Sequence, residues 1–86
     1  MKKQRSVGSL PDMIIMEPRG IYHGMALELK SEANSPFLVD GSLRKDLHVI
    51  AQARMLDRLK RKGYWAQFIV GIDEGRKLID LYMSWD

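Results

Sequence analysis

The order of apolar runs along the chain is the feature that most restricts its fold. Short runs of the strand type occur at residues 13–16, 21–30 and 64–70, each bounded by turn-forming or charged residues. Apolar residues recur with helical spacing at 43–62, and a last helical pattern covers 74–83. The order is β-β-α-β-α, which predicts an α/β fold with a small mixed sheet flanked by helices.

The first two strand-like runs are expected to pair with each other. Residues 13–16 are continuously apolar, which is typical of a strand buried on both faces. Residues 17–20 have turn chemistry, so 21–30 would return antiparallel to the first run. Residues 31–42 are rich in Asn, Ser, Pro, Asp and Gly, which predicts a loop that is long for so small a domain.

The helix ends are marked by residues that commonly start or stop helices. Gly63 suits the position just after the first helix, and the basic residues before it suit the negative end of the helix dipole. Asp73 is expected to cap the start of the last helix, which would bury Leu78, Ile79 and Tyr82.

The length of the chain leaves room for one domain. We expect that domain at residues 11–86, after a flexible lead-in at residues 1–10. A chain of this length buries only about 60–65% of its unfolded surface, so its core is modest and an oligomer would help to stabilise it.

Several function classes are excluded by what the sequence lacks. Cysteine is absent, which excludes disulfides, thiolate zinc sites and a cysteine nucleophile, and His23 and His48 are too few for a zinc site. The common nucleotide-binding, serine-hydrolase and zincin strings do not occur. No apolar stretch approaches the roughly 20 residues of a membrane span, and no signal-peptide core is visible. We therefore expect a cytoplasmic protein without a membrane partner.

Charged residues at the end of the second strand-like run are the first candidates for chemistry. Because side chains alternate along a strand, Glu28 and Lys30 share one face, with Leu29 on the other. Asp12, at the tip of the neighbouring strand, could supply a second carboxylate, and Pro11 precedes it. Two acids and a lysine suggest a Mg²⁺-dependent phosphodiesterase site. The alternative is a structural Glu–Lys pair on a solvated strand face.

Gln52 stands out because it interrupts the apolar stripe of its helix. A buried amide must find hydrogen-bond partners, and the polar face that carries Glu28 and Lys30 is one place to find them. A bond to the backbone, or a position at the edge of the stripe, is an equally good interpretation. The stripe also contains Val49, Met55, Leu56 and Leu59.

The net charge of +3 is mild, but the basic residues are clustered. A polyanion such as DNA is a reasonable partner, although such clusters also occur on merely solvated faces. Trp65 and Trp85 could stack on bases, or belong to the core or an interface. The candidate DNA-binding residues are Lys3, Arg5, Arg44, Lys45, Arg54, Arg58, Arg61 and Lys62.

These motifs together resemble the virus-type replication-repair nuclease (VRR-NUC) family of the PD-(D/E)XK nuclease superfamily. The resemblance rests on Pro11-Asp12, on Ala26-Leu27-Glu28-Leu29-Lys30 and on the helix that begins Gln52-Ala53-Arg54-Met55 and runs up to Gly63-Tyr64. It continues through Phe68-Ile69-Val70-Gly71-Ile72-Asp73-Glu74 and spans roughly residues 8–83.

The resemblance implies a small nuclease core that cleaves DNA with Mg²⁺ or Mn²⁺. Asp12 and Glu28 would ligate the metal together with the backbone carbonyl of Leu29. Lys30 would orient or activate the attacking water, and Gln52 would support the site. Phage-type stand-alone members are homodimers that resolve four-way (Holliday) junctions, which implies a homodimer in a bacterial or phage-infected cytoplasm.

One departure from the family pattern leaves two interpretations open. Family members open with a helix that carries a further acidic residue, whereas no Asp or Glu precedes Asp12 here. Either that acid is dispensable, or the chain is a variant with impaired cleavage. In the second case the chain would be a non-catalytic DNA-binding or accessory module that keeps the nuclease fold.

Overall fold

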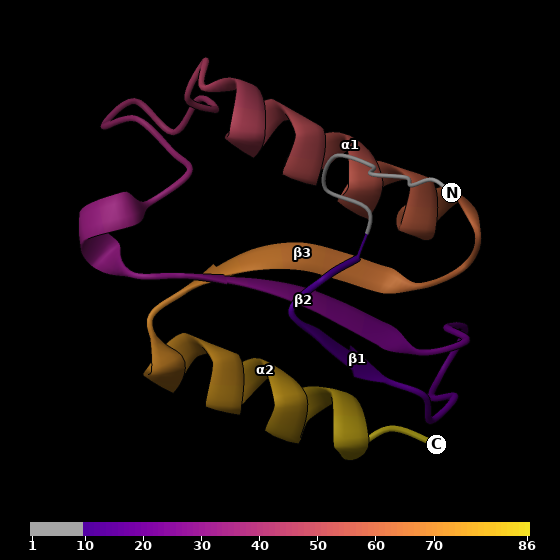
Figure 1. Cartoon of the computed structure of the whole chain (residues 1–86). Helices are drawn as coiled ribbons and strands as arrows, with labels where there is room; N and C mark the ends of the chain where they lie inside the picture. The colour runs from indigo at the N-terminus through magenta and orange to yellow at the C-terminus, as the bar shows by residue number, and fades with distance from the viewer. Residues whose placement is uncertain (1–9) are drawn as a thin grey trace.

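The computed structural model describes residues 10–86 as a three-stranded sheet between two helices (Figure 1). This architecture confirms the predicted β-β-α-β-α order and the small mixed sheet flanked by helices. The elements are β1 (Met13–Ile15), β2 (Met25–Lys30), a 3-10 helix η1 (Glu32–Asn34), α1 (Leu47–Arg61), β3 (Trp65–Val70) and α2 (Ile72–Met83).

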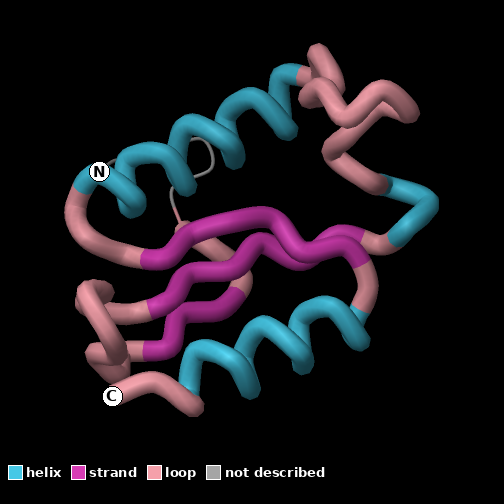
Figure 2. The backbone as a smooth tube through the Cα atoms, turned by 180° about the vertical axis from the view of Figure 1, so that it is seen from behind, coloured by secondary structure: helices cyan, strands magenta, loops and turns pink. Residues whose placement is uncertain are grey.

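The sheet has β2 at its centre, in the order β1-β2-β3. β1 pairs antiparallel to β2 with Met13 opposite Leu27, and β3 pairs parallel to β2 with Phe68 opposite Glu28. A parallel neighbour needs a long crossover, which α1 provides. Figure 2 shows the three strands side by side with one helix on each face of the sheet.

The two faces of β2 pack against different helices because side chains alternate along a strand. Ala26 faces α1 and Leu27 faces α2. The α1 side of the core contains Val49, Met55, Leu56, Ala66 and Phe68, and the α2 side contains Met25, Ile69 and Tyr82. Leu78 and Ile79 pack half-buried against the α2 side, so the predicted inner face of the last helix is confirmed.

β1 is an exposed edge strand, so the prediction that residues 13–16 are buried on both faces is wrong. Met13 and Ile14 are exposed, and Met16 is 86% exposed beyond the end of the strand. Continuous apolar runs are typical of central strands, but here only one neighbour pairs with the run.

The second and third elements begin later than the sequence predicts. β2 starts at Met25 rather than at residue 21, because Arg19 and Tyr22 form a tight bridge in which Gly20 adopts a positive φ of 56°. α1 starts at Leu47 rather than at residue 43, because the Asp46 side chain caps it. The loop predicted at 31–42 therefore contains η1 and extends to the cap.

The prediction that Asp73 caps the last helix is wrong. Gly71 occupies the cap position with φ of 88°, and Asp73 and Glu74 lie in the first turn. Acidic side chains suit that turn because the helix dipole is positive there. The predicted stop at Gly63 is confirmed, since its φ is 95° and Tyr64 N–H donates back into the last turn of α1 at 3.0 Å.

An aromatic cluster closes the end of the sheet where the chain finishes. The rings of Trp65 and Trp85 stack with centroids 5.0 Å apart, and Tyr82 meets both edge-on. Arg19 holds the chain end by donating to the carbonyl of Trp85 at 2.7 Å, and the Tyr82 hydroxyl donates to the carbonyl of Glu17 at 2.6 Å. The α2 end is thereby tied to the connection between β1 and β2.

Candidate active site

Asp12 reaches the centre of the sheet from the start of β1. The register that places Met13 opposite Leu27 brings Asp12 beside Glu28, the next residue of β2. Its carboxylate accepts the backbone N–H of Leu29 at 2.9 Å. An edge strand of three residues thus delivers one acid to the strand that carries the other.

Glu28 and Gln52 form a buried pair between the sheet and α1. Each is only 5% exposed, and Gln52 Nε2 donates to Glu28 Oε2 at 2.5 Å. Gln52, which interrupts the apolar stripe of α1, therefore contacts the polar face of β2. Of the two interpretations that the sequence allows for Gln52, this contact supports the one in which its amide bonds to the face that carries Glu28.

The environment of Glu28 does not favour its charged form. Burial raises the pKa of Glu28 above its ordinary value and repulsion from the Asp12 carboxylate raises it further, whereas attraction to Lys30 and to the backbone N–H of Asp12 lowers it by less. Glu28 Oε1 and Gln52 Oε1 are buried and have no hydrogen-bond partner among residues 10–86. Two orphaned oxygens beside a second carboxylate need a donor or a cation.

The residues present fit a hard divalent cation. Glu28 Oε1 and the Asp12 carboxylate are hard oxygen donors. The N–H and C=O groups of one residue in a strand point toward the same neighbouring strand. Because the N–H of Leu29 donates to Asp12, the carbonyl of Leu29 also points to the side of the sheet where Asp12 lies. No cluster of three or more His, Cys, Asp or Glu occurs in the described part of the chain. Mg²⁺ needs only one or two carboxylates, because it keeps several of its waters.

Lys30 ends β2 on the same face as Glu28 and lines a polar cavity of about 400 Å³. The cavity opens where β2 stops and α1 begins. Its other lining residues are Leu29, Ser31, Asn34, Arg44, Asp46, His48 and Val49. The sequence pattern did not single out Asn34, whose only signal was its place in the loop directly after the charged strand end.

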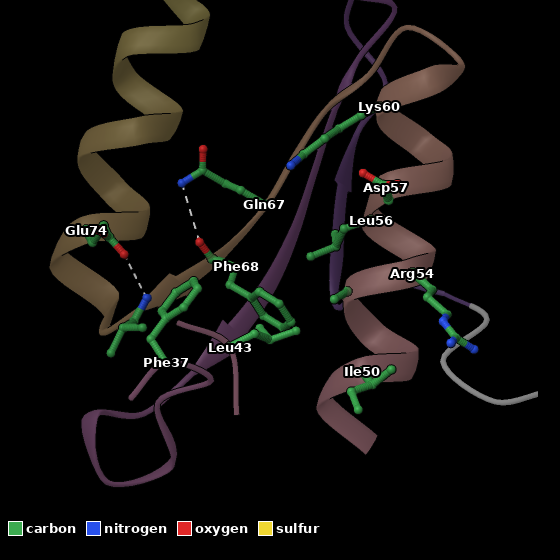
Figure 3. Close-up of a pocket in the computed structure, with 12 residues that line it drawn as sticks. Phe37, Leu43, Ile50, Arg54, Leu56, Asp57, Lys60, Gln67, Phe68 and Glu74 are labelled. Carbon is green, nitrogen blue, oxygen red and sulfur yellow. Dashed lines mark hydrogen bonds between the residues drawn. The ribbon is translucent and has the colours of Figure 1, made fainter. Parts of the chain in front are cut away.

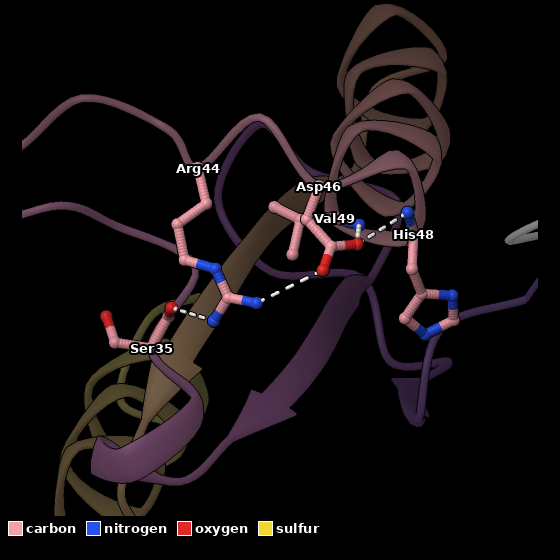
Figure 4. A network of polar contacts seen from close by, with 5 residues as sticks. All are labelled: Ser35, Arg44, Asp46, His48 and Val49. Carbon is pink, nitrogen blue, oxygen red and sulfur yellow. Dashed lines mark hydrogen bonds and ion pairs between the residues drawn. The ribbon is translucent and has the colours of Figure 1, made fainter.

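The candidate DNA-binding residue Arg44 is held within the loop that precedes α1 (Figure 4). It donates to the carbonyl of Ser35 at 2.8 Å and to Asp46 Oδ2 at 3.2 Å, while Asp46 caps the first N–H groups of α1. Two of its donors therefore shape the loop.

The other basic candidates among the described residues are exposed on the surface. Arg54, Arg58, Arg61 and Lys62 are exposed along α1, and Lys45 is exposed just before it. Arg61 pairs with Asp57 at 2.9 Å. Lys3 and Arg5 lie outside the described residues.

A solved structure named "VRR_NUC domain protein" matches this chain with a TM-score of 0.69 and 31% sequence identity. The fold is that of a VRR-NUC domain. The match covers 90% of this chain and 54% of the other, so this chain spans about half the length of the VRR-NUC protein it matches. No protein-family model matches the sequence, and no curated protein matches it. The resemblance to the VRR-NUC family drawn from the sequence is confirmed at the level of the nuclease-domain fold.

Within residues 10–86, no helix is long and apolar enough to span a membrane.

Proposed function

We propose that this chain is a Mg²⁺- or Mn²⁺-dependent endonuclease that hydrolyses phosphodiester bonds in branched DNA. The observation that carries the proposal is Glu28 Oε1, which is buried without a hydrogen-bond partner in the part of the chain that the structure describes and lies beside Asp12 and Lys30 on a nuclease-domain fold. A carboxylate kept in that state is costly to the folded protein unless a cation offsets its charge.

The side chains divide the work of hydrolysis. Asp12, Glu28 and the carbonyl of Leu29 would hold the metal, which when bound lowers the pKa of water and offsets phosphate charge. Lys30 would orient the attacking water and stabilise the negative charge that develops on the phosphate. Gln52 acts as a positioning residue, because its amide fixes one oxygen of Glu28 and leaves the other free. The water oxygen would bond to phosphorus and release a proton to solvent, the P–O bond to the leaving strand would break, and the leaving oxygen would take up a proton.

The substrate class and the assembly follow the phage-type stand-alone resolvases that the sequence resembles. A homodimer is proposed because cleavage of a four-way junction at two symmetric positions needs two sites related by a two-fold axis. Such an enzyme would act on DNA in a bacterial or phage-infected cytoplasm.

A second candidate function is a non-catalytic DNA-binding module. The observation that favours it is the small number of acids, since only Asp12 and Glu28 come together in the described residues. This module would bind branched DNA and would be indifferent to loss of either acid.

The test is cleavage of a labelled four-way junction compared with a linear duplex of the same sequence, in Mg²⁺, in Mn²⁺ and in EDTA. Lys30→Ala and Asp12→Ala should abolish metal-dependent junction cutting. The matched control is Lys77→Ala, which removes an exposed lysine from α2 and should cut normally. Normal cutting by Asp12→Ala would refute the site, and tight binding without any cutting would favour the second function.

A further inference from the structure

An exposed apolar protrusion stands between β2 and α1. We call residues 37–39 the finger: Phe37 and Leu38 are about half exposed, and Val39 is fully exposed. The turn at its tip is closed by hydrogen bonds, with Leu38 N–H donating to the carbonyl of Ser42 at 2.7 Å. Three consecutive exposed apolar residues on a closed turn are unusual for a surface that meets only water.

The base of the finger is fixed to the rest of the domain. Pro36 is buried, and the Phe37 ring packs edge-on against Phe68 with centroids 6.0 Å apart. Phe37 also forms a backbone bridge with Leu43, and Arg44 holds the carbonyl of Ser35. The finger is therefore a built feature of the surface.

An apolar groove of about 730 Å³ runs beside the finger, between α1 and the outer edge of β3 (Figure 3). The charged side chains in its lining are Arg54, Asp57 and Lys60 of α1 and Glu74 of α2. Its apolar lining consists of Phe37, Leu43, Ile50, Ala53, Leu56, Phe68 and Val70. Because Phe37 belongs to both features, the finger and the groove lie side by side on one face.

The outer edge of β3 forms one wall of the groove. Trp65 N–H donates to the carbonyl just before β2 at 3.0 Å, and Gly71 N–H donates to the carbonyl that ends β2 at 2.9 Å. Odd-numbered residues of β3 therefore face β2. The backbone groups of Phe68 and Val70 face outward, toward the groove.

Two side chains cover part of this edge and disfavour addition of a further strand. Glu74 accepts the N–H of Val70 at 2.7 Å, and the Gln67 amide donates to the carbonyl of Phe68 at 3.4 Å (Figure 3). Blunting of this kind protects sheet edges from strand pairing. The groove is better suited to apolar side chains than to a new strand.

We propose that the groove receives the finger of a second copy of this chain, and that the two copies exchange fingers about a two-fold axis. An isologous contact needs one patch that is complementary to itself, and an apolar knob beside an apolar groove meets that need. The inference gives the dimer of the proposed function its surface, and it rests on that function for its purpose.

Charged side chains beside the finger and in the groove favour the same exchange between two copies. Asp40 follows the finger, and its carboxylate is held at the tip by the hydroxyl of Ser42. In the groove, Asp57 is paired with Arg61 and Glu74 accepts the N–H of Val70, so the side chains that would meet the partner's acid are Arg54 and Lys60. Electrostatic pairs at a rim set register and encounter rate more than they set affinity.

DNA is a less suitable occupant for the finger. The acids of the loop are Glu32, Asp40 and Asp46, and its only bases are Arg44 and Lys45. Arg44 is paired with Asp46 at 3.2 Å. A segment without positive excess is a poor match for a phosphate backbone.

The test is the molar mass of the full chain by sedimentation equilibrium between about 1 and 100 µM. The unmodified chain should approach twice 9.9 kDa at the upper end of this range. Val39→Asp should weaken dimerisation by at least about 100-fold, because each dimer loses two finger contacts. The matched control is Leu47→Asp, which places the same charge at an apolar residue 85% exposed that does not line the groove, and it should dimerise normally.

The charge contact is tested separately with Arg54→Glu, which should weaken the dimer and reduce its dependence on salt. A chain that stays monomeric at 100 µM would overturn the proposal, and so would full dimerisation of Val39→Asp. Equal damage by Leu47→Asp would also overturn it, because the contact would then lie elsewhere. Loss of junction binding by Val39→Asp with an unchanged mass would assign the finger to DNA and refute the dimer surface.

The dimer mass measured in this way does not depend on whether the protein cleaves DNA. Lys30→Ala should lose cleavage and keep the dimer mass, so failure of the proposed function and failure of the finger contact are distinguishable.

Discussion

Replacing Glu28 with glutamine should make the metal-free protein more stable while it removes the proposed activity. Glu28 is 5% exposed, and its Oε1 has no partner among the described residues. Glutamine keeps the shape and the acceptor for Gln52, carries no charge, and replaces that Oε1 with an amide N–H group that can donate to Asp12 or to Gln52 Oε1. Leaving a buried polar atom unpaired costs roughly 1–3 kcal/mol, so we expect a gain of about 1–2 kcal/mol in the free energy of unfolding. For a domain of this size the gain corresponds to a rise in Tm of roughly 4–16 °C.

The assay is thermal unfolding followed by circular dichroism in EDTA at pH 7.5 and at lower pH. Burial and the neighbouring Asp12 raise the pKa of Glu28 above its ordinary value of 4.5, so the folded state binds the proton more tightly than the unfolded state. The wild type therefore bears the full cost above the folded pKa and loses it as the pH falls toward 4.5. The advantage of Glu28→Gln should shrink over the same pH range.

Addition of Mn²⁺ should reverse the order of stability. A metal that binds only the folded wild type stabilises it by about 2.7 kcal/mol at one hundred times its Kd, whereas the variant lacks one ligand. Glu32→Gln is the control, because Glu32 is an exposed acid outside the site. If Glu28→Gln melts at or below the wild-type temperature in EDTA at pH 7.5, Glu28 does not bear an uncompensated charge and the reasoning is refuted.

Three further substitutions test packing contacts in other parts of the fold. Gly24→Ala places a Cβ 2.6 Å from the carbonyl oxygen of Ile15 and should destabilise the fold by about 1–3 kcal/mol in urea titration; an unchanged midpoint would contradict the close approach of the strands. Trp85→Ala removes a half-buried ring stacked on Trp65 and should cost about 2–3 kcal/mol in the same titration, and a loss below 0.5 kcal/mol, roughly that of an ordinary surface change, would argue that the chain end does not pack. Arg44→Ala should release the base of the finger and speed limited proteolysis there severalfold at unchanged Tm, whereas equal proteolysis would show that the arginine does not hold the loop.

The polar pair at the centre of the site could be predicted from the sequence because both halves depend on local periodicity. Alternation along β2 places Glu28 on the face that meets α1, and helical spacing places Gln52 on the buried stripe. Each rule holds without knowledge of the rest of the chain. The sequence left a bond from Gln52 to the backbone equally open, and only the structure shows that its amide donates to Glu28.

The exposure of β1 could not be predicted in the same way. A run such as residues 13–16 shows that the chain is apolar, but strand order in the sheet decides whether a second neighbour covers it. That order depends on the crossover through α1 and on packing between distant elements. The start of α1 differs from the predicted one for a similar reason: Leu43 continues the apolar pattern, but the helix begins only after Asp46, whose side chain caps it.

Hydrophobic periodicity in the sequence does not predict the finger or the groove either. Phe37 is fixed by Phe68, which lies 31 positions away in the sequence, and Arg44 is turned inward by a backbone carbonyl rather than outward to a polyanion. From the sequence, Phe37 is only a loop residue and Arg44 only a basic residue. Their roles depend on tertiary contacts that no local rule contains.

The hydrogen bond between Asp12 and the backbone of Leu29 makes one amide a reporter of the site. Leu29 N–H lies beyond the three paired residues of β1, and a carboxylate rather than a strand accepts it. Its proton can exchange with solvent only when Asp12 leaves, so its exchange rate measures how often the two acids separate. Opening of a short edge strand costs far less than global unfolding, which makes this rate a direct reading of how preassembled the two acids are before any ion or DNA arrives.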